Sequence, residues 1–284
     1  MGRGDLTAQL PAPVEREWDA EGVRIHGAVW ERPGTGAPPL VLLHGIWDTW
    51  RTFAGVAPRL ALGRAVYALD LRGHGDSDKP ERGYRHADYA ADVLAVLRQL
   101  PHGRVDLLGF SLGALVAAHL AAGQPGRIAR LVLEDPPLDP AADPRGRAAW
   151  FAALLELKRL PFEEVVGELA ALHPGRDRAT TEASARALIN TADGPFRAHL
   201  DREDGEDAGT DFPALLAWIA ASGPPTLVLR ADPARGGALA DAGRDQLLAA
   251  LPAARLVEFP GAGHLIHAER PDEFVAAVEA FLSD

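Results

Sequence analysis

Ser111 is the residue of this sequence best placed to act as a nucleophile. It joins an apolar, strand-like run at 105–110 to a helix-forming run at 112–122, and Gly109 and Gly113 lie two residues away on either side. Because the chain has only five serines, the expected number of chance matches to Gly-x-Ser-x-Gly is about 0.05. Flanking glycines permit a sharp strand-to-helix turn, which exposes the hydroxyl at the edge where the strands end. The pattern predicts nucleophilic catalysis by Ser111.

A serine hydroxyl needs a base to accept its proton, and His264 is suited to that role. It follows the last apolar run in a Gly-Ala-Gly loop and precedes the final helix, which Pro271 begins. His267 is the nearest rival, but it already lies close to that helix. The two histidines could also suggest a metal site, yet no third ligand of suitable spacing accompanies them and the chain has no cysteine. We therefore expect His264 as the base and no bound metal.

Four segments of the chain resemble the α/β-hydrolase family. They are HGIWDTW at 44–50, LDLRGHGDSDKP at 69–80, GFSLG at 109–113 and GAGHLIHAERPDEF at 261–274. The resemblance extends over nearly the whole chain. It implies a triad in the chain order serine, acid, histidine, an oxyanion hole made by two backbone N–H groups, and a helical cap over the pocket. It also implies structural parts for His44 and His74 in their loops.

Two aspartates at strand ends compete to be the acid of the triad. In the family the commonest acid follows the strand after the cap, which favours Asp232, although the usual position, about three residues beyond the strand end, here holds Ala234. Asp135 ends an earlier strand, at a position that some relatives of the fold use. The other candidates are Glu134 and Asp241. We expect Asp232 as the acid, with Asp135 as the alternative.

The oxyanion hole and the pocket are assigned by position. By resemblance, the N–H groups of Ile46 and Leu112 converge on the substrate carbonyl oxygen, because these residues follow His44-Gly45 and the nucleophile. Aromatic side chains near the oxyanion segment and in the cap either wall the substrate pocket or pack the interior. The aromatic candidates are Trp47, Trp50, Trp150 and Phe151.

The remaining pattern predicts an α/β fold. A hairpin at 14–30 is followed by short, continuously apolar runs that alternate with helical segments, which is typical of a mostly parallel twisted sheet flanked by helices. Residues 139–220 have helical periodicity alone, so they are interpreted as an inserted helical cap (lid) on a core of 1–138 and 221–284. The acidic stretch 201–207 within the cap is interpreted as a solvated loop.

Composition excludes several classes of function. A net charge of −11 over 284 residues repels nucleic acids and anionic membranes. The first residues contain no apolar signal-peptide core, and no apolar run is long enough for a membrane helix, so a cytoplasmic protein is expected. No nucleotide-binding glycine motif is present, so we expect no cofactor. The expected partner is a small-molecule acyl substrate, and the oligomeric state is not indicated.

These features together predict an enzyme. A serine at 111 disfavours the epoxide-hydrolase and haloalkane-dehalogenase branches, because both need a carboxylate nucleophile there. The prediction is a serine hydrolase that cleaves a carboxylic ester or lactone through an acyl-enzyme. The alternatives are an acyltransferase, a carbon–carbon bond hydrolase with the same triad, and a non-catalytic ligand-binding receptor on the same fold.

Overall fold

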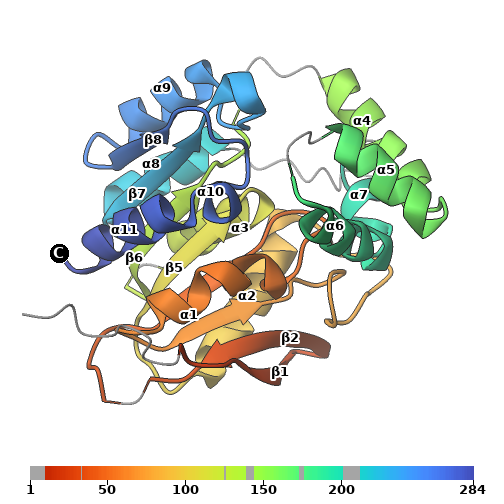
Figure 1. Ribbon diagram of the computed structural model, residues 1–284. Coiled ribbons are helices and arrows are strands. Elements are labelled where there is room, and N and C mark those ends of the chain that lie inside the picture. Colours follow the sequence, from red (N-terminus) through yellow and green to blue (C-terminus); the bar gives the residue numbers. More distant parts are fainter. Residues whose placement is uncertain (1–9, 33, 125, 139–143, 173–175, 201–211) are drawn as a thin grey trace, which may run out of the picture.

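A single sheet of eight strands organises the chain. The computed structural model describes residues 10–32, 34–124, 126–138, 144–172, 176–200 and 212–284. The strands lie in the order β1-β2-β4-β3-β5-β6-β7-β8; β1 and β2 form an antiparallel hairpin, and β3 to β8 run parallel (Figure 1). Their bounds are β1 Val14–Ala20, β2 Val23–Trp30, β3 Leu40–Leu43, β4 Val66–Leu69, β5 Val105–Phe110, β6 Ile128–Glu134, β7 Thr226–Ala231 and β8 Arg255–Phe259. The predicted α/β fold is confirmed.

Helices cover both faces of the sheet (Figure 1), which explains why β3 and β4 consist entirely of buried, mostly apolar residues. In β3, the successive residues Leu42 and Leu43 are both fully buried but belong to separate apolar clusters. Successive side chains of a strand point to opposite faces, so each face has its own core. One core is packed by η1 (Trp50–Gly55), α1 (Ala57–Leu60) and α11 (Pro271–Leu282), and the other by α2 (His86–Gln99), α3 (Leu112–Gly123), α8 (Phe212–Ser222) and α9 (Asp241–Ala250).

Between β6 and β7 the chain forms a separate group of helices. These are α4 (Pro144–Leu157), α5 (Phe162–Leu172), α6 (Arg178–Asn190) and α7 (Gly194–Arg197), drawn in green in Figure 1. They share an apolar cluster of their own, which includes Phe151, Val165, Leu188 and Phe196. They lie within residues 139–220, the range for which an inserted helical cap is predicted. The acidic stretch 201–207 lies outside the described residues.

Helix α8 differs from the expectation that residues up to 220 belong to the cap. It packs against α3 and α9, and Leu216 and Ile219 are buried in the same cluster as Val116 of α3. Within the described residues, α8 (Phe212–Ser222) therefore belongs to the helical layer on the sheet, together with α3 and α9. None of the helices in the described parts of the chain has the length and apolar character needed to cross a membrane.

Candidate active site

Ser111 occupies the predicted turn from β5 to α3. Its backbone has φ 52° and ψ −115°, and the residue is 8% exposed. Positive φ brings the side chain of an ordinary residue against its own backbone, so this conformation is strained. Among the described residues, four non-glycine residues have positive φ, and three of them, Trp47, Ser111 and Asp135, lie at the ends of the central parallel strands. Strain is thus concentrated at the edge where the predicted site lies.

The two glycines that flank Ser111 are required by close backbone contacts. A Cβ atom on Gly109 would lie 2.1 Å from the carbonyl oxygen of Gly113, and one on Gly113 would lie 2.2 Å from the carbonyl oxygen of Leu43. Real Cβ atoms do not approach backbone oxygen so closely, so each position excludes a side chain. The glycines allow α3 to begin directly against β3 and β5.

The segment after β3 lies beside the nucleophile. A Cβ atom on Gly45 would lie 3.2 Å from the Cβ of Ser111, and within the described chain no acceptor takes the N–H of Ile46. Leu112 is the first residue of α3, so its N–H has no partner within the helix. Both predicted oxyanion donors are therefore available at the side of Ser111.

His44 fixes the shape of this segment. The ring is fully buried, its Nε2 accepts the N–H of Leu71 at 3.0 Å, and its Nδ1 lies 2.7 Å from the carbonyl oxygen of Gly45. The neighbouring ring of His74 is also buried; burial lowers its pKa to about 3, and its Nδ1 bonds the carbonyl oxygen of Arg72 at 2.8 Å. Both rings therefore bond backbone groups of their loops, which agrees with the structural roles that the resemblance implies.

The carboxylate beside His264 belongs to Asp135. Oδ2 of Asp135 lies 2.6 Å from Nδ1 of His264, and the aspartate side chain is fully buried. Three backbone N–H groups, those of Ala231, Ala238 and Leu239, donate to the same carboxylate at 3.2, 2.7 and 3.3 Å. A buried carboxylate with four hydrogen-bond partners is held in one place, and so is the imidazole that bonds to it.

The structure does not bring Asp232, the expected acid, to His264. Oδ1 of Asp232 accepts the N–H of Ala234 at 2.9 Å and Oδ2 accepts the N–H of Gly261 at 2.9 Å, and these donors lower the pKa of Asp232. The carboxylate thereby begins η2 (Pro233–Arg235) and ties it to the loop after β8. Asp135, the alternative acid, lies beside the histidine instead; it directly follows β6, the next strand in the sheet after β5.

The aromatic candidates for the pocket separate into two groups. Trp50 is 4% exposed and packs edge-to-face on Trp30 at a ring distance of 5.8 Å, so it belongs to the core and not to a pocket. Trp47, next to the oxyanion segment, contacts Trp150 of α4 at 5.2 Å, and Trp150 is 44% exposed. Phe151 is buried and stacks on His199 at 4.0 Å. Trp47 and Trp150 thus form a contact between the segment after β3 and α4.

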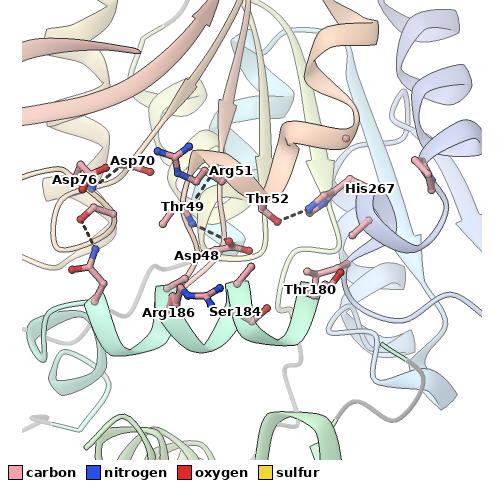
Figure 2. A pocket seen from close by; sticks show the side chains of 18 of the residues that line it. Asp48, Thr49, Arg51, Thr52, Asp70, Asp76, Thr180, Ser184, Arg186 and His267 are labelled. Carbon is pink, nitrogen blue, oxygen red and sulfur yellow. Dashed lines mark hydrogen bonds between the residues drawn. The ribbon is translucent and has the colours of Figure 1, made fainter. Parts of the chain in front are cut away.

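A cavity of about 820 Å³ separates α6 from the loops after β3 and β8 (Figure 2). One wall includes Asp48, Thr52 and Leu265, which are close in sequence to Ile46 and to His264. The opposite wall is the face of α6 that carries Thr180 and Ser184. The cavity therefore lies next to the two loops of the site.

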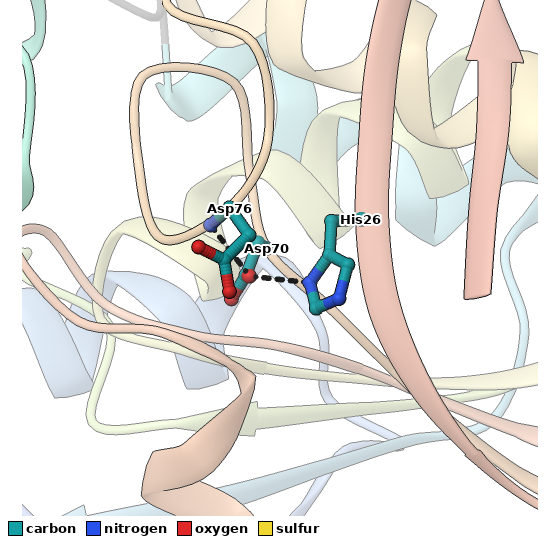
Figure 3. Close-up of side chains that lie close together, drawn as sticks. All are labelled: His26, Asp70 and Asp76. Atoms are coloured by element: carbon teal, nitrogen blue, oxygen red, sulfur yellow. Dashed lines mark hydrogen bonds and ion pairs between the residues drawn. The ribbon is translucent and has the colours of Figure 1, made fainter. Parts of the chain in front are cut away.

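His26, Asp70 and Asp76 form the one group in the described residues with ligand atoms close enough for a metal ion (Figure 3). Oδ2 of Asp70 already interacts with Nδ1 of His26 at 2.9 Å and accepts the N–H of Asp76 at 3.1 Å, while Oδ1 accepts the N–H of Trp50 at 2.7 Å. The carboxylate is thus used to fix three segments of chain. We interpret the group as an ion pair that supports the loop after β3.

This ion pair predicts a pH dependence of stability. The hydrogen bond to Asp70 raises the pKa of His26 against the effect of burial, and burial of Asp70 is outweighed by its hydrogen bonds, so its pKa is lowered. The contribution of His26 to the free energy of unfolding is present below the ordinary pKa of 6.5 and is lost as pH rises through the raised pKa. The contribution of Asp70 is present above pH 3.8 and is lost as pH falls through the lowered pKa.

In urea unfolding, His26→Gln should therefore lower the free energy of unfolding more at about pH 5.5 than at about pH 8.5. An equal cost at both pH values would contradict this assignment.

The chain is similar to known proteins over most of its length. Residues 40–277 match the model of the alpha/beta hydrolase family. An uncharacterized protein of Mycobacterium tuberculosis is 30% identical over 91% of this chain and 79% of its own length, and the sn-1-specific diacylglycerol lipase ABHD11 of Xenopus laevis is 28% identical over 86% and 80%. The crystal structure of a hydrolase from Pseudomonas aeruginosa PA01 is 28% identical, with a TM-score of 0.77 over 95% of this chain and 98% of that one. This chain belongs to the α/β-hydrolase family.

Proposed function

We propose that the protein is a serine hydrolase that cleaves a carboxylic ester or lactone through an acyl-enzyme. Ser111 is the nucleophile, His264 the general base and then acid, and Asp135 the carboxylate that orients it. The observation that carries the proposal is the 2.6 Å contact between a fully buried Asp135 and His264. It is supported by the strained turn at Ser111 and by the oxyanion segment beside it.

The geometry suits acyl transfer in two stages. Asp135 accepts Nδ1–H of His264, which leaves Nε2 to take the proton of the Ser111 hydroxyl as its oxygen attacks the carbonyl carbon. The N–H groups of Ile46 and Leu112 stabilise the negative charge that develops on the carbonyl oxygen. His264 then protonates the leaving oxygen, and a water molecule activated by the same ring hydrolyses the acyl-enzyme.

Covalent labelling tests this proposal. We expect a fluorophosphonate to add one adduct per chain in intact-mass spectrometry and the unlabelled enzyme to hydrolyse p-nitrophenyl acetate and butyrate. Both activities should be absent in Ser111→Ala, whose melting temperature should stay close to that of the natural protein. Turnover retained by the variant would contradict the mechanism, and the absence of any adduct on folded protein would favour a ligand-binding receptor.

A further inference from the structure

A second histidine–carboxylate pair lies directly beside the first. Glu134 precedes Asp135, and His267 follows His264 by three residues. Oε1 of Glu134 accepts the backbone N–H of His267 at 2.9 Å and lies 2.8 Å from its Nδ1. Both side chains are fully buried. Burial of a carboxylate costs free energy unless the group is paired. The pair therefore acts as a fixed connection between β6 and α10 (Ile266–Glu269), the short helix that contains His267.

The other ring nitrogen of His267 connects this pair to the segment after β3. Nε2 lies 2.8 Å from Oγ1 of Thr52, a half-buried residue of η1 that lines the cavity under α6 (Figure 2). Because Nδ1 faces the carboxylate, Nε2 remains for the threonine hydroxyl. The interaction joins two positions that are 215 residues apart in the chain.

The pair is also in contact with the nucleophile turn. The backbone carbonyl of Glu134 accepts the N–H of Ser111 at 3.0 Å. The ring of Phe110 contacts both imidazoles, at 4.7 Å from the ring of His264 and 5.1 Å from the ring of His267. Phe53 packs on the second imidazole at 4.9 Å. His267 therefore contacts all the segments that carry the proposed catalytic groups.

We propose that Glu134, His267 and Thr52 are positioning residues that hold the side chains of Ser111 and His264 in place relative to each other. This inference rests on the proposed function. They act through buried hydrogen bonds to the backbone and ring of His267, three residues from the proposed base. A displacement of about 1 Å in a catalytic group can lower the rate by about 100-fold. A small shift of the segment from His264 to His267 is therefore enough to lower activity.

The test compares the rate at which a fluorophosphonate labels Ser111 in four variants of the full chain. We expect His267→Gln to lower this rate by about 10- to 100-fold. Thr52→Val, which removes one hydroxyl at equal volume, should lower it by about three- to tenfold, and Thr52→Ser should restore the natural rate. The KM for p-nitrophenyl butyrate should stay within about twofold of the natural value, since this set of residues acts on the reacting groups and not on binding.

His102→Gln is the matched control, because His102 lies before the amino end of β5 and its Nε2 is 3.4 Å from the Tyr67 hydroxyl. It should label at the natural rate. If His267→Gln does not fold, Thr52→Val decides, because it changes a cavity wall and leaves the buried pair intact. Natural labelling rates in folded His267→Gln and Thr52→Val would overturn the positioning role, as would an adduct on Thr52. If the natural protein itself is not labelled, the proposed function fails instead.

Discussion

Asp135→Asn is expected to lower kcat for p-nitrophenyl butyrate by about 10⁴-fold, by analogy with the same change in serine proteases. The carboxylate is 2.6 Å from Nδ1 of His264 and has no exposed surface. An asparagine amide at this place favours the wrong tautomer, in which Nε2 carries the proton and cannot accept another from Ser111. Steady-state kinetics over a range of pH and the fluorophosphonate labelling rate measure the loss.

Asp232→Asn is the matched comparison for this prediction. Asp232 lies in the loop between β7 and α9, and its carboxylate accepts only backbone N–H groups among the described residues. Its change to asparagine should leave kcat within a few-fold of the natural value. A 10⁴-fold loss of kcat in Asp232→Asn, with kcat of Asp135→Asn nearly unchanged, would identify Asp232 as the acid and contradict the geometry of the site.

The contrast between these two aspartates shows what the sequence could not predict. The strand β5, the helix α3 and the turn at Ser111 are local, because apolar runs and two glycines define them within 20 residues. The choice of acid depends on how loops separated by 129 residues meet. Both aspartates end parallel strands, so both reach the same edge of the sheet, and only the paths of the following loops separate them.

The sequence contains a signal for the second histidine–carboxylate pair. Glu134-Asp135 and His264-x-x-His267 are two doublets of complementary chemistry, and the structure pairs them member by member. Burial of the second pair could not be foreseen, because it depends on Phe53, Phe110 and Phe274 packing around His267. For the same reason Trp50 was a pocket candidate: its packing on Trp30 of β2 is a tertiary contact that no local pattern predicts.

Replacing Ser111 should separate the requirements of catalysis from those of stability. Ser111→Ala and Ser111→Gly should both lower kcat by about 10⁶-fold, the loss that removal of the nucleophile causes in a serine protease. Ser111 has φ 52°, a conformation whose cost for a residue with a Cβ is about 1–3 kcal/mol and which glycine adopts freely. The greater entropy of glycine in the unfolded chain offsets about 0.5–1 kcal/mol of that relief.

The glycine variant should therefore unfold at a higher temperature than the alanine variant, by about 2 °C for a chain of this size. Thermal unfolding of the two inactive proteins under identical conditions measures the difference. A lower melting temperature for Ser111→Gly would mean that the turn stores no strain at this residue. If the expected order is observed, the fold keeps a destabilising backbone conformation at the position where the proposed chemistry requires a nucleophilic hydroxyl.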